Sequence, residues 1–433
     1  MMERRGAPAH GGHTRDRATR RSGLPAREDD GAAAPPRVIR FRTSLHNTVF
    51  DVMKARNWVE TDSEEGWDFC WADTGWVHEN FDHMHFGEQQ RINHFRNHYE
   101  LTRKDLLVKN LKRAKKSLEK EESPAEAAKY AFFPQTYCVP AEYGLFVEEF
   151  KRTQGVWIMK PIGRAQGKGI FLFNKLSQIA EWKKDSRWQK PGEPTADSYV
   201  AQRYLENPYL IGGKKFDLRL YALVVSYSPL KVYLYRSGFA RFSNTRFSMK
   251  KEDIANNYIH LTNVAVQKTA ENYNSKSGMK WSLRSLKLYL TSRHGSEAIN
   301  DLFYDMQNLI VRSLQAVAPV IINDKHCFEI YGYDLLIDDN LKPWLIEVNA
   351  SPSLSSDTPA DYELKFGMLD DAFSIIDMEG RLNHQDHPEP QVGGFDLVWN
   401  NGPVAGNKTL PSMMGTHNDR LKNLRSLFAA GPR

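Results

Sequence analysis

The stretch YGYDLLIDDNLKPWLIEVNASPSLSS, residues 331–356, gives the clearest indication of the fold. Two apolar runs flank a polar turn, which is the pattern of a β-hairpin. Each run nevertheless carries polar groups where a buried strand is normally apolar. Asp334 lies in the first run, and Glu347 and Asn349 lie in the second. The presence of two carboxylates and an amide in this hairpin therefore requires an explanation.

Strand register predicts where these three side chains lie. A turn centred between Asn340 and Leu341 would place Asp334 opposite Glu347. Because Glu347 and Asn349 are two residues apart, they share one face of their strand. On this register, three apolar side chains would pack the opposite face: Trp344, Ile346 and Val348.

Such a polar face has two explanations. Buried carboxylates are costly unless they are paired or bind a cation, and carboxylate and amide oxygens suit Mg²⁺. The alternative is a polar sheet face that is exposed to water. A second motif, upstream in the chain, favours the cation.

That motif is KPIGRAQGKGIFLF, residues 160–173. A predicted strand ends at its start, a loop with glycines follows, and a second strand begins at Ile170. Glycines let the backbone approach a ligand closely, and its N–H groups can then hold phosphate oxygens. No helix follows the loop, unlike in Walker and dinucleotide-binding motifs. Two antiparallel strands over a nucleotide are therefore favoured, although an ordinary surface turn would explain the loop taken alone. Its glycines and basic residues are Gly163, Gly167, Gly169, Lys160, Arg164 and Lys168.

Two further segments carry charged residues on predicted strands and loops. In residues 199–221, the strand end 202–205 suits contacts with an adenine. Lys215 and Asp217 are two residues apart and therefore share a face of the strand. Lys215 could hold a phosphate, and Asp217 the ribose or a metal-bound water. A salt-bridge ladder on an edge strand is the alternative. Residues 235–268 add groups that could bind an amino acid, although each taken singly is better explained by a surface position: Arg236, Arg241, His260, Thr262, Asn263 and Lys268.

The remaining segments have simpler patterns. Residues 1–36 hold few large apolar side chains, so we expect them to be disordered. Alternation in RVIRFR and WDFCWAD predicts strands, and HNTVFDVMKARN predicts a helix with Val49, Val52 and Met53 inward. Residues 100–123 predict one long basic helix, which is either a solvated face or a docking surface for an acidic partner.

The C-terminal half is predicted to be richer in strands. Residues 155–161, 169–174, 199–205, 216–227 and 231–242 alternate in the manner of strands. After about residue 380 the chain is rich in Pro, Gly and Asn, which predicts a loose tail. Residues 295–320 predict a helix with one apolar face: Ile299, Leu302, Phe303, Met306, Leu309 and Ile310.

Composition limits the class of protein. The 433 residues are 41% hydrophobic, which suffices for a large core in two or three subdomains. No apolar run of about 18 residues or secretory signal is present, so no membrane association is predicted. The net charge of +6 suits an acidic partner. No motif supports nucleic acid, so an acidic protein surface is favoured. The widely spaced Cys70, Cys138 and Cys327 indicate a reducing cytoplasm, and His78, His83 and His85 match no zinc spacing.

These motifs, in this order, resemble those of the tubulin-tyrosine-ligase-like enzymes, which are ATP-grasp ligases that add amino acids to tubulin. The segments are KPIGRAQGKGI, QRYL, GKKFDLRLYALV, HLTNVAVQK and YGYDLLIDDNLKPWLIEVNASPSL. The resemblance covers about residues 37–380 and is greatest to the short polyglutamylase branch. It implies a mixed α+β or α/β ATP-grasp fold around a nucleotide cleft. Its divisions would be a disordered start (1–36), an N-terminal domain (37–125), a central subdomain (126–225), a C-terminal subdomain (226–380) and a tail (381–433).

The resemblance also implies roles for single residues. ATP would be bound by Lys160, Gln166, Gly167, Lys168, Gln202, Arg203, Tyr204, Leu205, Lys215, Phe216 and Asp217. The incoming amino acid would be bound by Arg241, Thr262, Asn263 and Lys268, although Val264 and Ala265 stand where some relatives have Lys-Tyr. Asp334, Glu347 and Asn349 would hold Mg²⁺, expected as two ions. Lys160, Arg219 and Glu347 would be catalytic.

The implied function is addition of glutamate to side chains of the acidic tubulin tail through an acylphosphate. We expect Arg241 to favour glutamate, because its second carboxylate needs a cation. A glycine or tyrosine ligase of the same fold and a non-catalytic microtubule-binding relative are the alternatives. Tubulin and free L-glutamate would be the partners, and an accessory subunit is left open. The expected location is the cytoplasm and cytoskeleton, at a cilium, basal body or flagellar axoneme.

Overall fold

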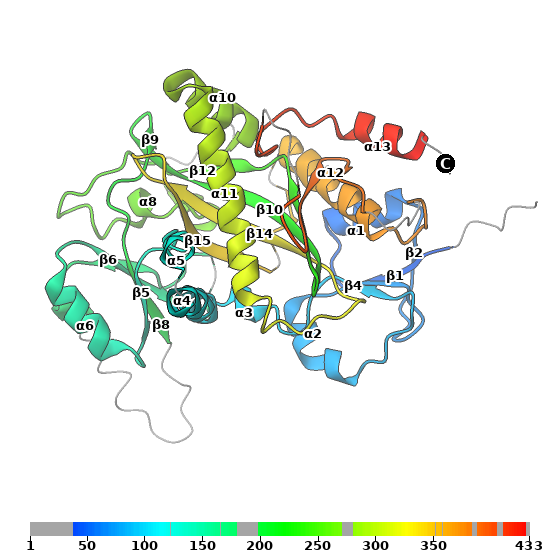
Figure 1. Ribbon diagram of the computed structural model, residues 1–433, viewed down its shortest axis with the longest axis horizontal. Coiled ribbons are helices and arrows are strands. Elements are labelled where there is room, and N and C mark those ends of the chain that lie inside the picture. The colour runs from blue at the N-terminus through cyan, green and yellow to red at the C-terminus, as the bar shows by residue number, and fades with distance from the viewer. Residues whose placement is uncertain are drawn as a thin grey trace, which may run out of the picture. The chain divides into compact units, whose positions relative to one another are not determined.

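The computed structural model describes residues 38–121, 123–164, 166–179, 198–270, 280–350, 352–356, 358–382, 388–404 and 410–429. The predicted disorder of residues 1–36 lies outside these ranges. The described chain contains a parallel sheet, a small antiparallel sheet and a large, mainly antiparallel sheet, with helices packed on them (Figure 1). No described helix has both the length and the apolar character needed to cross a membrane.

The N-terminal sheet is parallel throughout, with strand order β2-β1-β3-β4. Asn47 caps the first helix by accepting from the N–H of Val49. The predicted inward residues Val49, Val52 and Met53 are fully buried, so this helix prediction is confirmed. The elements are β1 (Arg40–Thr43), α1 (Thr48–Ala55), β2 (Val59–Glu60), β3 (Phe69–Trp71), α2 (Thr74–Asn80), the 3-10 helix η1 (Phe81–His83) and β4 (Arg91–Ile92).

The basic segment 100–123 is not one helix as predicted. It forms α3 (Tyr99–Thr102) and α4 (Lys104–Lys120), separated at Arg103. Arg103 is extended (φ −83°, ψ 125°), and its guanidinium pairs with Asp105 in the first turn of α4. The break sets the direction of α4 independently of α3. A short helix, α5 (Pro124–Ala128), follows.

The central sheet is antiparallel, with strand order β5-β8-β6-β7. A helix covers one face and buries Phe146 against Trp157 and Phe173. The strands at 155–161, 169–174 and 199–205 are therefore confirmed. The elements are β5 (Thr136–Val139), α6 (Tyr143–Arg152), β6 (Trp157–Pro161), β7 (Phe171–Phe173), the 3-10 helix η2 (Leu176–Ile179) and β8 (Tyr199–Arg203).

The large sheet is built around the long strand β10 (Lys214–Tyr227). The predicted boundary between the central and C-terminal subdomains, between residues 225 and 226, falls inside this strand. Strand β10 pairs with β11 and β12 along one edge and with β14 along the other. The other strands are β9 (Leu210–Ile211), β11 (Leu230–Tyr235), β12 (Phe239–Phe242), β13 (Lys280–Ser282), β14 (Glu329–Ile337), β15 (Pro343–Asn349), β16 (Gln391–Val392) and β17 (Phe395–Asn400). The helices that follow β12 are α8 (Asn257–His260), α9 (Val264–Gln267), α10 (Leu283–His294), α11 (Ser296–Val317), α12 (Pro359–Ile376) and α13 (Arg420–Ala429).

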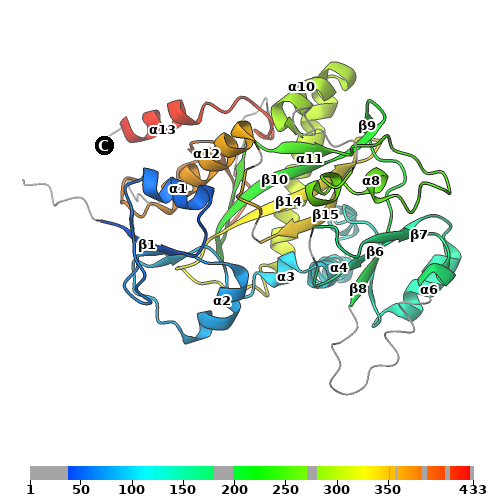
Figure 2. The same ribbon diagram turned by 180° about the vertical axis from the view of Figure 1, so that it is seen from behind.

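Alternation along β10 separates two cores. Leu218, Leu220 and Ala222 belong to the core that includes α11, whereas Tyr221 and Leu223 belong to the core that includes α1 and α12. Successive side chains of a strand point to opposite faces, so one strand supplies both layers. Figures 1 and 2 show the sheet from its two sides, with α11 lying across one face. All six apolar residues predicted to face inward on α11 are buried.

The described parts of the predicted tail, 388–404 and 410–429, contain strands and a helix that were not predicted. Residues 395–400 form β17, which pairs with β11 and extends the large sheet. Arg420, the first residue of α13, pairs with Asp370 and Asp371 of α12. Polar composition suggested a loose tail, but these long-range contacts could not be read from the local sequence.

Candidate nucleotide and metal site

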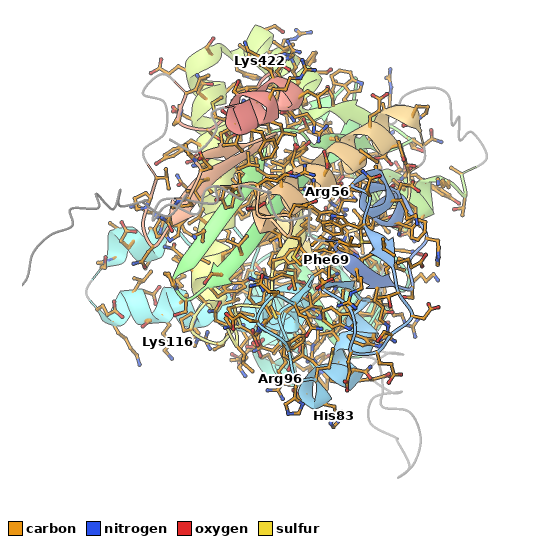
Figure 3. The ribbon with its side chains drawn as sticks, turned by 90° about the vertical axis from the view of Figure 1, so that its right-hand side faces the viewer. Arg56, Phe69, His83, Arg96, Lys116 and Lys422 are labelled. Carbon is orange, nitrogen blue, oxygen red and sulfur yellow. The ribbon has the colours of Figure 1, made fainter. Side chains whose placement is uncertain are left out.

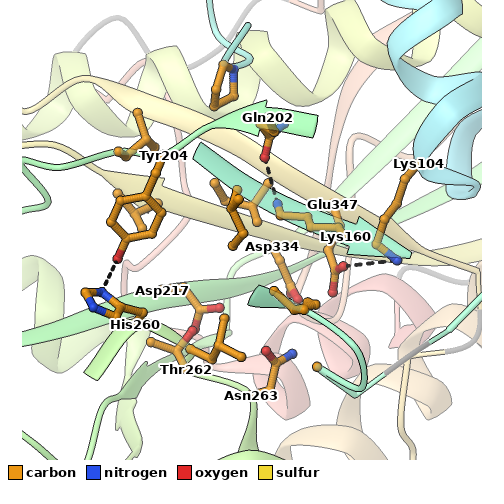
Figure 4. A pocket seen from close by; sticks show the side chains of 18 of the residues that line it. Lys104, Lys160, Gln202, Tyr204, Asp217, His260, Thr262, Asn263, Asp334 and Glu347 are labelled. Carbon is orange, nitrogen blue, oxygen red and sulfur yellow. Dashed lines mark hydrogen bonds and ion pairs between the residues drawn. The ribbon is translucent and has the colours of Figure 1, made fainter. Parts of the chain in front are cut away.

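One pocket lies between the central and the large sheet and gathers most of the predicted site residues (Figure 4). Strands β6 and β8 supply one wall, and β10, β14 and β15 supply another. Three of the apolar residues that line it are Ile158, Leu336 and Ile346. The predicted residues that line it are Lys160, Gln166, Gly167, Gln202, Arg203, Tyr204, Leu205, Lys215, Asp217, Thr262, Asn263, Asp334, Glu347 and Asn349.

Lys160 is held in the pocket by its neighbour on the adjacent strand. Its Nζ donates to Gln202 Oε1 at 2.7 Å, and Gln202 Nε2 donates to Thr136 Oγ1 at 2.9 Å. Burial lowers the pKa of Lys160 to about 8, although the charge of Glu347 opposes this shift. The ammonium group is therefore poorly solvated and would gain by meeting an anion.

Lys215 is a second buried cation in this pocket. Its Nζ donates to Tyr204 Oη at 3.0 Å and to the carbonyl oxygen of His260 at 2.8 Å. Burial lowers the pKa of Lys215 to about 7, against the opposing charge of Asp217. Two lysines that are costly to keep charged suit a site for a polyanion such as a triphosphate.

The loop between β6 and β7 requires glycine at residue 167. Gly167 has φ +78°, and a Cβ atom there would lie 2.8 Å from Val266 Cγ2 and 3.4 Å from Asn263 Oδ1. The loop therefore packs on the segment 263–266 with its backbone exposed to the pocket. Such an approach is the reason for glycines in phosphate-binding loops.

The hairpin places Asp334 opposite Glu347, as predicted, but for a different reason. Near the turn, Ile337 pairs with Pro343 and Leu335 with Leu345, so the turn is centred on Asn340. A β-bulge at Ile346 then shifts the register by one residue and brings Glu347 opposite Asp334.

The bulge also corrects the predicted packing of β15. Ile346 lines the pocket together with Glu347 and Asn349, whereas it was expected on the opposite face. Leu345 and Val348 are the residues that enter the core. Because a bulge sets two residues against one, adjacent residues can point to the same side.

Four buried charges alternate across three strands at the pocket, and two of them, Asp217 and Asp334, line it. Arg219 pairs with Asp334 through contacts of 2.5 and 3.0 Å, and Arg241 pairs with Asp217 through contacts of 2.8 and 2.5 Å. Arg241 also lies 2.7 Å from Asp334. Burial alone would raise the pKa of Asp334, but the two guanidinium groups outweigh it and hold this pKa well below its usual range.

The hairpin side chains carry the oxygen types that Mg²⁺ binds, and a bound ion would share the Asp334 carboxylate with Arg219 and Arg241. Asn349 Nδ2 donates to the carbonyl of Gly332 at 3.2 Å, which leaves the amide oxygen as the atom offered to the pocket. Asp334 stays ionised, and the carboxyl side chain of Glu347 is 24% exposed. Within the described ranges, no group of three or more His, Cys, Asp or Glu is arranged to hold a metal by itself. Two carboxylates and an amide suit an ion that also binds phosphate oxygens.

Of the residues to which the resemblance assigns a role, five do not line this pocket. Arg236, another candidate for the amino acid, also lies outside it and pairs with Asp396. Arg219 and Arg241 lie behind Asp334 in the ion-pair network, and Phe216 points into the core from the other face of β10. Lys168 is exposed on the loop, and Lys268 is exposed at the end of α9. Their assigned roles remain predictions.

Lys104 is a pocket residue that the sequence did not indicate. It is the first residue of α4, and its Nζ lies 3.9 Å from Glu347 Oε2 and 3.4 Å from the carbonyl of Arg164 (Figure 4). It stands 60 residues before Arg164 in a helix full of lysines, so no local pattern distinguishes it. Only the break at Arg103 turns it toward the pocket.

Comparison with known proteins gives a family for this arrangement. A model of the tubulin-tyrosine ligase family matches residues 82–384. The chain is 53% identical over 430 residues to "Probable tubulin polyglutamylase TTLL9" of Bos taurus, covering 90% of this chain and 92% of the relative. It is 46% identical over 370 residues to "Probable tubulin polyglutamylase ttll-9" of Caenorhabditis elegans, covering 84% and 86%. It is 45% identical over 384 residues to "Probable alpha-tubulin polyglutamylase Ttll1" of Tetrahymena thermophila, covering 83% and 92%. The resemblance seen in the motifs is thus confirmed, and the chain belongs to the tubulin-tyrosine ligase family.

Proposed function

We propose that this chain is an ATP-dependent ligase that adds glutamate to glutamate side chains of tubulin C-terminal tails. The names of its relatives support this substrate and reaction. The observation that carries the proposal is the single pocket where two buried lysines meet the hairpin acids. That combination suits chemistry on a triphosphate.

An ATP-grasp arrangement accounts for the position of this pocket. The loop between β6 and β7 and the strand β8 would hold ATP from one side, and β10 with the hairpin would hold it from the other. The apolar side chains of Ile158, Leu336 and Ile346 in the lining of the pocket suit a purine ring. The first side and the pocket residues of β10 fall in the predicted central subdomain, 126–225, and the hairpin falls in the predicted C-terminal subdomain, 226–380.

In the proposed reaction, a tail carboxylate attacks the γ-phosphate of ATP, giving an acylphosphate and ADP. The amine of free glutamate then displaces phosphate to form an amide. Lys160 and Lys104 would reduce the repulsion between the carboxylate and the triphosphate, since both present ammonium groups to the pocket. Gln202 would keep Lys160 in place through the contact at 2.7 Å.

Mg²⁺ would be held by Asp334, Glu347 and Asn349 and would add positive charge beside the phosphates. Arg219 and Arg241 would keep Asp334 ionised and oriented for this task. Neither arginine then needs to touch a substrate.

The choice of glutamate rests on the names of the relatives more than on Arg241. The guanidinium of Arg241 is already bound by Asp217 and Asp334, so a substrate carboxylate would have to compete with both. Incubation of the protein with microtubules, ATP and labelled glutamate, glycine or tyrosine tests the donor. We expect incorporation of glutamate alone. Incorporation of glycine or tyrosine without glutamate would contradict the proposal.

The outer face of α4 is proposed to bind the acidic tail region. Four basic residues recur at intervals of three or four along this helix, within an arc of about 60°. Figure 3 shows one of them, Lys116, pointing away from the rest of the molecule. Within the described part of the chain, Lys109, Lys116 and Lys120 make no ion pair. The exposed set is Lys109, Arg113, Lys116 and Lys120.

Charge reversal tests this surface. The double variant Lys116→Glu/Lys120→Glu should weaken binding to microtubules at least several-fold at low salt, because both charges would then repel the tail. The matched control is Lys422→Glu/Arg425→Glu, an exposed basic pair on α13. Equal binding by both variants would contradict the role of α4. Fluorescence imaging of the tagged chain would test the proposed location on ciliary or axonemal microtubules.

A further inference from the structure

Three side chains at the pocket form a hydrogen-bond chain whose direction can be assigned. The carbonyl oxygen of Asp253 can only accept, so His260 Nε2, 3.0 Å away, carries the ring proton. Burial and the charge of Lys215 lower the pKa of His260 to about 4, which keeps the ring neutral at pH 7. His260 Nδ1 is then an acceptor, and the Tyr204 hydroxyl, 2.9 Å away, donates to it (Figure 4).

The direction of this chain fixes how Tyr204 meets Lys215. Because the Tyr204 proton points to His260, its oxygen is turned toward the donor Lys215 Nζ at 3.0 Å. The carbonyl oxygen of His260 accepts a second N–H from the same ammonium at 2.8 Å. An ammonium carries three N–H groups. One N–H of Lys215 is therefore fixed by the His260 carbonyl, and a second by the Tyr204 hydroxyl, which His260 orients. The third N–H is available to a ligand.

We propose that Tyr204 and His260 are positioning residues that hold the Lys215 ammonium ready for an acceptor atom of ATP. The inference rests on the proposed function only in taking ATP as the ligand. A lysine side chain loses considerable rotamer freedom when it is fixed. A chain that fixes it before binding removes this cost from the binding step, which is the principle of preorganisation. No proton needs to move along the chain.

The test is the affinity for ATP, measured by calorimetry on the full chain without tubulin. Tyr204→Phe keeps the ring that lies 4.7 Å from Lys215 Nζ and removes only the hydroxyl. His260→Leu removes the acceptor of that hydroxyl. Each variant should weaken ATP binding about 10-fold, the value of one hydrogen bond that involves a charged group. The double variant should bind no more weakly than the poorer single variant, because both changes break one chain.

A conservative variant separates positioning from folding. His260→Asn keeps an acceptor oxygen near the place of Nδ1, so its affinity should stay within about 3-fold of the wild type. The control is Tyr227→Phe, which removes another buried hydroxyl bond, 2.9 Å long, to Tyr331 in the main core. It should lower the melting temperature and leave the affinity for ATP unchanged.

Three results would overturn the inference. The first is an affinity of Tyr204→Phe for ATP equal to that of the wild type. The second is a loss of affinity in the double variant equal to the product of the two single losses. The third is a wild-type chain that does not bind ATP. Tyr204→Phe retains the ring and still decides the matter if His260→Leu fails to fold. A chain that shows the expected ATP affinities but adds no glutamate to tubulin would contradict the proposed function and leave this inference standing.

Discussion

Replacing Arg219 by methionine should unbalance the buried charges at the pocket. In the wild type, Arg219 and Arg241 balance Asp217 and Asp334, so the network carries no net charge. Without Arg219, one negative charge is left in excess, and Asp334 is only 2% exposed. Removal of one partner of a buried ion pair typically costs about 3–5 kcal/mol. Arg241 still contacts Asp334 at 2.7 Å, so the lower end, about 3 kcal/mol, is expected.

The double variant Arg219→Met/Asp334→Leu provides the decisive comparison. It leaves the balanced pair of Arg241 and Asp217, so most of the lost stability should return, to within about 1 kcal/mol of the wild type. Urea denaturation at pH 7, followed by tryptophan fluorescence, measures all three chains. Arg103→Met is the control, because its ion pair with Asp105 lies at the surface, with the Arg103 side chain 51% exposed, and should be worth less than about 1 kcal/mol. Two results would contradict a role for charge balance in stability. One is a loss of stability in Arg219→Met as small as that of the control, and the other is a double variant less stable than Arg219→Met.

Two further predictions concern the pocket. Below their pKa values of about 8 and 7, Lys160 and Lys215 are charged, so kcat/KM for ATP should fall as the pH rises through this range. Lys160→Arg, which stays charged, should make the fall shallower; identical profiles would contradict the role of Lys160. Gly167→Ala should raise KM for ATP about 10-fold or more, because φ is +78° and the new Cβ would lie 2.8 Å from Val266. Gly163→Ala, with nothing within 4 Å of its Cβ, is the control, and equal KM values would refute the argument from close packing.

Local patterns predicted the elements well where one face was buried. Alternation located β10, and the spacing of apolar residues located α11 with all six of its inward residues. The polar residues of the hairpin were also placed on one face, although the bulge at Ile346 was not foreseen. The turn centre was predicted half a residue too late, which changes the register by one residue. The bulge at Ile346 changes the register by one residue as well, so the predicted pairing of Asp334 with Glu347 is still correct.

Contacts between distant segments were beyond the sequence patterns. Lys104 reaches the pocket only because the chain is extended at Arg103, and nothing in a row of lysines marks that position. Arg241 looked like a ligand for a carboxylate, and it is one, but the carboxylates belong to Asp217 and Asp334. Sequence can suggest which charges a site contains, whereas strand register decides which of them meet each other.

Mass spectrometry of tubulin tails tests the central claim most directly. Microtubules would be incubated with free glutamate, with or without ATP, and with the wild type, Glu347→Gln or the exposed control Glu148→Gln. We predict that the wild type and Glu148→Gln lengthen the tails by whole glutamyl residues on glutamate side chains, only with ATP. Glu347→Gln should bind microtubules and add at least 100-fold less, since the pocket loses a carboxylate at the phosphates. Unmodified tails with the wild type, or equal modification by Glu347→Gln, would contradict the account.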